Sequence, residues 1–120
     1  MRKLKVDTYL TLDGVMQAPG GPDEDTSGGF THGGWSVKYW DQRMNDLLRA
    51  VMGKPFDLLL GRRTYEIFAA YWPRAVDQPA AAPLNNATKY VASFATEPNQ
   101  EEIDQRREVL QEGATADHAS

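Results

Sequence analysis

The residues most suited to chemistry lie in the stretch Gly61-Arg62-Arg63-Thr64, between a short apolar run and a helical pattern. Backbone N–H groups in the first turn of a helix lack intrahelical partners, so they attract an anion. Glycine permits close approach of a ligand, and arginine offers paired donors that match phosphate oxygens. The stretch therefore predicts a phosphate site. In the alternative interpretation, Thr64 caps the helix and both arginines are solvated.

The elements that must position this stretch follow from hydrophobic periodicity. Gly53 and Pro55 end one helical pattern, and Pro73 ends another. The expected order is strand 4–12, helix 37–51, strand 56–60, helix 65–72 and strand 88–93. This alternation predicts an α/β fold with parallel strands and with helices on the sheet faces. The aromatic stripe of the second helix is expected to pack in the core rather than to stack on a ligand: Tyr65, Phe68 and Trp72.

Residues 13–35 form a long connection that contains seven of the ten glycines and two prolines. Loops of this length inside a compact domain usually have a function, so we expect a lid over a ligand, with an inert surface loop as the alternative. The acidic insert 23–28 resembles the start of a calcium loop, but Gly34 stands where a bidentate glutamate is required. His32 has no nearby histidine in the sequence, so it is expected to be a loop residue, and no metal site is predicted.

Composition narrows the class of protein. The chain has 120 residues, a net charge of −4 and no cysteine. An acidic chain without a basic run does not favour nucleic acid as a partner, and the absence of cysteine excludes thiolate chemistry. The first 14 residues lack a continuous apolar run, so neither a signal peptide nor a membrane segment is predicted. We expect a cytoplasmic protein without membrane attachment.

Two motifs together resemble a known family. "LLLGRRTYE" is similar to the segment of the dihydrofolate reductase fold that contacts the phosphates of NADPH. "TYLTLDGVMQAPGG", followed by "GGW", resembles a bacterial branch of that family related to the reductase domain of the riboflavin-biosynthesis deaminase-reductase. The resemblance covers residues 2–93. It implies a three-layer α/β fold with a mainly parallel central sheet, and hydride transfer from NADPH to a small heterocyclic substrate, pterin-like or pyrimidine-like.

The resemblance also implies roles for individual residues. The cofactor would be bound by Gly61, Arg62, Arg63, Thr64 and Ser93. The substrate side would be formed by Asp13, Gly14, Trp35, Tyr39 and Trp40. The catalytic group is not assigned by the resemblance, and Asp13 and Asp41 are the candidates, because reduction of a C=N bond needs a proton for the nitrogen. In the alternative interpretation, Asp41 is an acid that stabilises the start of a helix.

The sequence departs from the family after Ser93. Residues 94–120 form a polar segment without a second glycine-rich turn, with a helix expected over about 99–112 and disorder beyond it. We therefore expect residues 1–93 to be the N-terminal portion of a reductase-like domain whose fold is incomplete at the C-terminal end. The alternative function is a non-catalytic, truncated reductase-like domain that folds as an oligomer and binds nucleotide weakly or not at all. Members of the branch are commonly dimers, so a homodimer is expected.

Overall fold

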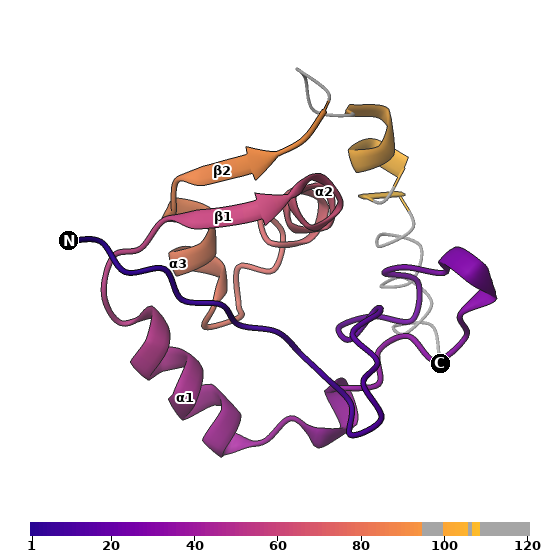
Figure 1. The fold of residues 1–120 in the computed structure, drawn as a ribbon, viewed down its shortest axis with the longest axis horizontal. Coiled ribbons are helices and arrows are strands. Elements are labelled where there is room, and N and C mark those ends of the chain that lie inside the picture. Colours follow the sequence, from indigo (N-terminus) through magenta and orange to yellow (C-terminus); the bar gives the residue numbers. More distant parts are fainter. Residues whose placement is uncertain (95–99, 106, 109–120) are drawn as a thin grey trace. The chain divides into compact units, whose positions relative to one another are not determined.

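A computed structural model describes residues 1–94, 100–105, 107 and 108 of the chain. It divides into two compact units, Met1–Met44 and Asn45–Ser120. The elements along the chain are the 3-10 helices η1 (Ser27–Gly29) and η2 (Val37–Tyr39), α1 (Gln42–Met52), β1 (Leu58–Gly61), α2 (Arg62–Tyr71), α3 (Ala81–Asn86) and β2 (Lys89–Ala92) (Figure 1). Residues 100–105 are also helical.

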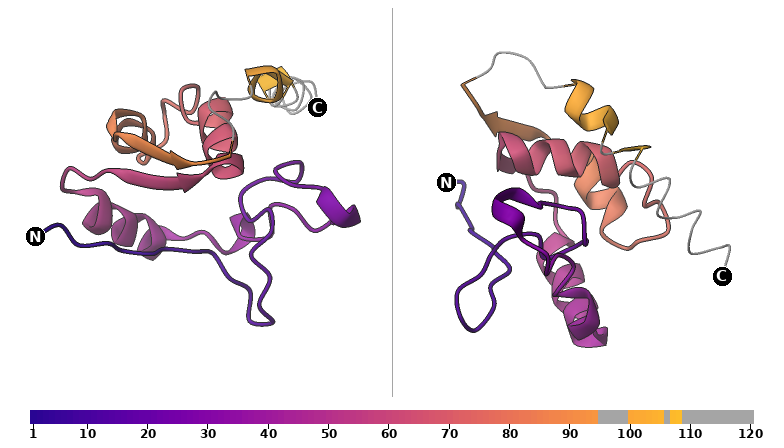
Figure 2. Two further views of the ribbon diagram at one scale, coloured as in Figure 1. Left: turned by 45° about the horizontal axis from the view of Figure 1, so that its top comes forward. Right: turned by 90° about the vertical axis from the view of Figure 1, so that its right-hand side faces the viewer.

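The sheet of the second unit consists of β1 and β2, which pair in parallel. Leu58 pairs with Lys89, and Gly61 pairs with Ala92, so both strands end at the same edge. Helix α2 follows β1 without a loop and packs on both strands (Figure 2). This arrangement confirms the α/β class and the expected strands near 56–60 and 88–93. The sheet formed by the described residues has two strands.

The core of the second unit is built largely from small side chains. The buried apolar residues are Ala70, Ala80, Ala81, Leu84, Ala87 and Ile103, and Glu66 is buried with them. The aromatic stripe of α2 is only half-buried, so the expectation that it fills the core is wrong. Alanines on α2 and α3 occupy the buried positions instead, because short side chains let backbones approach closely. The aromatic rings surround this core at its surface.

The segment 4–12 is not a strand, in contrast to the prediction from its alternating pattern. Leu4, Val6 and Leu12 are exposed, and residues 3–10 make no backbone hydrogen bond with any other described residue. A strand requires a neighbour that accepts and donates its backbone hydrogen bonds, and the pattern of one segment does not supply it.

Two helices also differ from expectation. Helix α1 starts at Gln42, later than the predicted 37, because residues 37–39 form η2 and Trp40 has extended backbone angles. It ends at Met52, as the signals at Gly53 and Pro55 predict. Helix α3 lies in a connection for which no helix was predicted. Of the expected helix over about 99–112, residues 100–105, 107 and 108 are helical, and the other positions lie outside the described residues.

The connection 13–35 is held by its own hydrogen bonds. The Gln17 side-chain amide donates to the carbonyls of Asp25 and Ser27 at 3.1 and 2.9 Å, and Glu24 Oε2 accepts from the backbone N–H groups of Gly20 and Gly21. An added Cβ at Gly33 would lie 2.5 Å from the Pro22 carbonyl oxygen, so only glycine fits there. The loop is therefore an ordered structure in which η1 is the only helical turn.

No helix within the described part of the chain is both long and apolar enough to cross a membrane.

Candidate functional site

The five residues expected to bind a cofactor come together at one edge of the sheet. Gly61 is the last residue of β1, and α2 begins at Arg62. Because Gly61 pairs with Ala92, Ser93 follows β2 at this same edge. The carboxyl edge of a parallel sheet is where α/β proteins bind ligands. The backbone thus gathers, from two strands, the residues to which the resemblance assigns cofactor binding.

Arg62 is held by a carboxylate of its own helix. Its Nε donates to Glu66 Oε1 at 2.8 Å, and the Glu66 side chain is 1% exposed, whereas that of Arg62 is 41% exposed. The hydrogen bond to Glu66 and the charge of Glu66 raise the pKa of Arg62, with a smaller contribution from Glu102. A guanidinium tethered through Nε still has two terminal amino groups in a fixed orientation. Glu66 therefore positions Arg62 at the start of α2.

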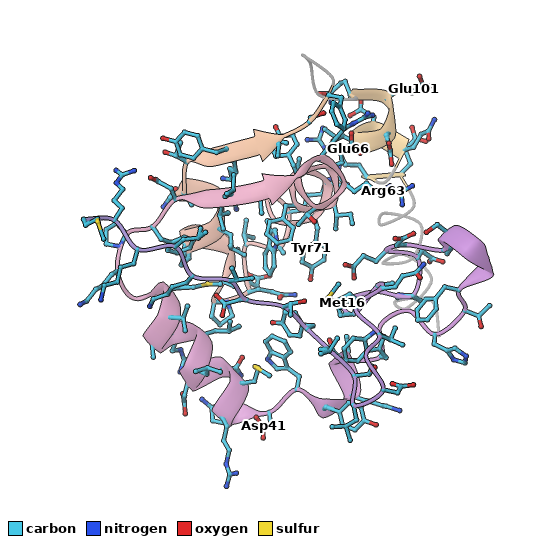
Figure 3. The ribbon with its side chains drawn as sticks, viewed as in Figure 1. Met16, Asp41, Arg63, Glu66, Tyr71 and Glu101 are labelled. Carbon is cyan, nitrogen blue, oxygen red and sulfur yellow. The ribbon has the colours of Figure 1, made fainter. Side chains whose placement is uncertain are left out.

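Glu66 is the residue of this candidate site that the sequence interpretation missed. Its second carboxylate oxygen, Oε2, is buried and accepts no hydrogen bond from the described residues. A buried carboxylate requires a partner, and Arg62 is the ion-pair partner of Glu66 among the described residues. The spacing of four residues along a helix was the available signal. Figure 3 shows Glu66 and Arg63 on α2.

No side chain of the described residues caps the start of α2. This observation argues against the alternative interpretation in which Thr64 caps the helix. The N-cap residue is Gly61, and no side chain accepts a hydrogen bond there. Gly61 has φ −73° and ψ 158°, which any residue adopts, and an added Cβ would meet no atom of the described residues within 4 Å. Neither the backbone angles nor packing against the described residues requires a glycine at position 61.

Asp13 and Gly14 lie in a tight turn of the first unit. The Gly14 N–H donates to the Thr11 carbonyl at 3.0 Å, and Gly14 has φ 91°, a conformation that favours glycine. The Thr11 hydroxyl donates to Asp13 Oδ1 at 2.5 Å. This bond, together with the backbone N–H of Asp13, lowers the pKa of Asp13. Asp13 is therefore a carboxylate at neutral pH. A carboxylate accepts hydrogen bonds from N–H groups and has no proton to donate, so a binding role suits Asp13 better than the role of a general acid.

Asp41, the other candidate acid, caps α1. Its Oδ1 accepts the backbone N–H of Met44 at 2.9 Å, the geometry of an N-cap. This contact gives Asp41 a structural role, in line with the alternative interpretation of the sequence. A catalytic role for either aspartate stays a prediction.

The three aromatic residues expected on the substrate side have different surroundings. The Trp35 indole N–H donates to the Gln17 carbonyl at 2.9 Å, which anchors this ring to the loop. Trp40 stacks on Tyr9, with ring centroids 6.2 Å apart, and burial followed by the charge of Asp7 raises the pKa of Tyr9. Tyr39 is exposed, with the Lys38 ammonium 5.0 Å from its ring centroid. All five residues expected on the substrate side belong to Met1–Met44.

A groove of about 490 Å³ lies beside the aromatic stripe of α2 in the second unit. Its lining includes Tyr65, Phe68, Trp72, Leu84, Lys89 and Arg107. Its two cations are engaged locally, since Lys89 Nζ donates to the Asn85 carbonyl at 2.8 Å and Arg107 donates to the Ala69 carbonyl at 3.4 Å. The groove therefore combines aromatic walls with two positive side chains.

The described residues contain no group of three or more side chains that could hold a metal ion. His32 is exposed and makes an edge contact with Phe30, as a loop residue would. The chain matches no family model and no curated protein sequence.

Proposed function

We propose that this chain is a reductase-like protein that binds NADPH at the carboxyl edge of the β1–β2 sheet. The observation that carries the proposal is the convergence of Gly61, Arg62, Arg63 and Thr64 with Ser93 at that edge. N–H groups in the first turn of a helix lack intrahelical partners, and those of α2, together with the oriented guanidinium of Arg62, suit phosphate oxygens. The open space beside Gly61 suits close approach of a phosphate group.

In this function, the residues of the chain bind and orient, and the cofactor supplies the hydride. Glu66 fixes the guanidinium of Arg62, so its terminal amino groups form paired hydrogen bonds with a phosphate at little entropic cost. The substrate class is a small heterocycle of pterin-like or pyrimidine-like shape, bound by Asp13, Gly14, Trp35, Tyr39 and Trp40. The corresponding fold is a dihydrofolate-reductase-like, three-layer domain in a cytoplasmic homodimer.

The experiment is a titration of the purified chain with NADPH, followed by cofactor fluorescence. Arg62→Gln combined with Glu66→Gln removes the arginine without leaving a buried carboxylate unpaired. We expect the double variant to bind NADPH at least tenfold more weakly than Glu66→Gln alone, since one charged hydrogen-bonding group contributes roughly 1.5–3 kcal/mol. Asp46→Asn combined with Arg49→Gln, an exposed pair on α1, is the matched control and should bind as the native chain does.

Gly61→Ala separates binding from folding. The added Cβ meets no atom of the described residues, so circular dichroism and thermal unfolding should be unchanged, while affinity for NADPH should fall. Equal NADPH affinity in the native chain, the double variant and Gly61→Ala would contradict the proposed site. The same would follow from a folded native chain that does not bind NADPH at millimolar concentration.

The second candidate function is a non-catalytic, reductase-like domain that folds as an oligomer. It is favoured by the small two-stranded sheet and by exposed apolar side chains such as Leu59 and Tyr90 on its strands. Binding of NADPH without turnover of any pterin or pyrimidine substrate would favour this second function over the first.

A further inference from the structure

The groove beside α2 and α3 is a feature that the proposed function does not use. Its volume of about 490 Å³ lies in the range of about 300–1,000 Å³ that small-molecule sites occupy. Lys89, which lines it, is the first residue of β2 and pairs with Leu58, the first residue of β1. Gly61 and Ser93 lie at the opposite, carboxyl edge of the sheet. None of the five candidate cofactor residues lines the groove, so it is a separate feature.

The walls of the groove are apolar and largely aromatic. Tyr65, Phe68 and Trp72 are half-buried along one face of α2, and Leu84 of α3 is buried. The Phe68 and Trp72 rings meet edge to face, with centroids 6.0 Å apart. Aromatic side chains attract further rings in offset-stacked or edge-to-face arrangements. The walls therefore favour a ligand with a flat, apolar body.

Hydrogen bonds across the groove hold its walls in place. Asn85 Nδ2 donates to the Trp72 carbonyl at 2.9 Å, which joins α3 to the end of α2. Lys89 Nζ donates to the Asn85 carbonyl at 2.8 Å, which joins β2 to α3. Because these elements are already connected, little of the chain has to be ordered when a ligand enters.

The charges at the groove specify the charge of the ligand. Arg107 Nη1 pairs with the Asp104 carboxylate at 3.2 Å, and Nη2 donates to the Ala69 carbonyl at 3.4 Å, so this cation is offset locally. Lys89 donates to a neutral carbonyl, and no carboxylate of the described residues pairs with it. An ammonium group has three N–H donors, so two remain. One uncompensated cation beside apolar walls matches a single anionic group.

We propose that this groove binds a planar aromatic carboxylate, with its ring against the aromatic side chains of α2 and its carboxylate on Lys89 Nζ. A single ammonium group balances a carboxylate but not a phosphate dianion, which would leave excess negative charge on a chain of net charge −4. This site does not depend on the binding of NADPH at the carboxyl edge.

The test uses cinnamate, a planar aromatic carboxylate, and its neutral analogue cinnamamide, each titrated into the full chain and followed by amide NMR. Shifts should be confined to residues near the groove, 65–73 and 84–89. Lys89→Gln should weaken the binding of cinnamate about fivefold and leave that of cinnamamide unchanged, because it removes one charged hydrogen bond. Lys54→Gln, at an exposed lysine that does not line the groove, should leave both affinities unchanged.

Filling the groove tests the binding of the ring. Ala69→Leu places a larger side chain in the space and should abolish the binding of both ligands. Ala82→Leu adds the same volume at an exposed position of α3 that does not line the groove, so both ligands should still bind. Circular dichroism checks that both variants are folded, and the result with Lys89→Gln does not depend on the folding of Ala69→Leu.

Four results overturn the proposal. The first is a folded native chain that does not bind cinnamate up to its solubility limit. The second is an equal effect of Lys89→Gln on cinnamate and cinnamamide. The third is displacement of cinnamate by NADPH, because the groove would then belong to the cofactor site. The fourth is a self-association of the native chain that Ala69→Leu abolishes, because a second copy would then cover the groove. Since cinnamate and NADPH are titrated separately, failure of one site is distinguishable from failure of the other.

Discussion

The two units of the chain are held together by different interactions. The structure describes every residue of Met1–Met44, and Ala18 is the one buried residue among them. Hydrogen bonds from the side chains of Gln17 and Trp35 hold the backbone of this unit. In Asn45–Ser120, alanines with Leu84 and Ile103 form an apolar core beneath a parallel sheet. The expected cofactor residues belong to the second unit and the expected substrate residues to the first. In the proposed function, phosphate recognition would rest on a packed core, and the substrate side would rest on loop geometry.

The largest effect should come from the core of the second unit. Leu84→Ala removes a side chain that is 5% exposed, and we expect a loss of about 2–3 kcal/mol in the free energy of unfolding. The value lies toward the lower end for leucine because Leu84 also lines the groove, where part of the space is already open. Urea unfolding measures the loss, and amide hydrogen exchange locates it.

Peptides from residues 45–94 should lose protection from exchange in Leu84→Ala, while those from 1–44 should not. Val76→Ala, at an exposed site of the same unit, is the control and should change stability by less than about 0.5 kcal/mol. Equal loss of protection in both units would show that they unfold together, and the contrast between them would then be wrong.

An intermediate loss of stability should follow from replacing Gly33, in the first unit, with alanine. The matched control is the same replacement at Gly61, in the second unit. In Gly33→Ala, the Cβ would lie 2.5 and 2.6 Å from the carbonyl oxygens of Pro22 and Gly21, so the loop must shift. We expect a cost of about 1–3 kcal/mol, comparable to overpacking a tight site. In Gly61→Ala, the Cβ meets no atom of the described residues, so stability should be unchanged.

Hydrogen exchange again distinguishes the units. Gly33→Ala should increase exchange at Gly34 and Ser36, whose N–H groups donate to the Ala18 and Pro19 carbonyls, and leave residues 58–72 unaffected. If Gly61→Ala destabilises the chain as much as Gly33→Ala does, the short distances from a Cβ at position 33 to the Pro22 and Gly21 carbonyl oxygens are not the reason that this position requires glycine.

The second unit was the part of the fold that the sequence predicted well. The strands near 56–60 and 88–93 and the helix after Gly61 are observed, because short apolar runs and a stop at proline are local signals. Helix α3 was missed because its alanines and Pro83 look like a connection. Pro83 is the third residue of α3, where a missing N–H costs no intrahelical hydrogen bond, so it does not prevent the helix.

The failures share a physical reason, which is that local patterns do not show which residues become paired or buried when the chain packs. The segment 4–12 has the alternation of a strand but forms no backbone hydrogen bonds with another described strand. The sequence predicts Arg62 as a solvated or ligand-binding cation, and it does not show that Glu66, four residues later, is buried and pairs with it. The gathering of Gly61 and Ser93 at one edge was predictable, because parallel strands end together.

The smallest effect should be the pH dependence of the turn around Asp13. Its pKa is lowered from 3.8, first by the Thr11 hydroxyl, so the turn is stabilised at neutral pH. Because the folded pKa lies below the unfolded one, the stabilisation is complete above the unfolded value and is lost as the pH falls through the folded one. Thr11→Ala should raise the pKa of Asp13 toward 3.8, and Thr8→Ala, at an exposed site nearby, should leave it unchanged. An NMR titration of the Asp13 carboxyl carbon measures the shift. An unchanged pKa in Thr11→Ala would mean that the backbone N–H alone holds the carboxylate, and the hydroxyl would then act only as acceptor for Val15.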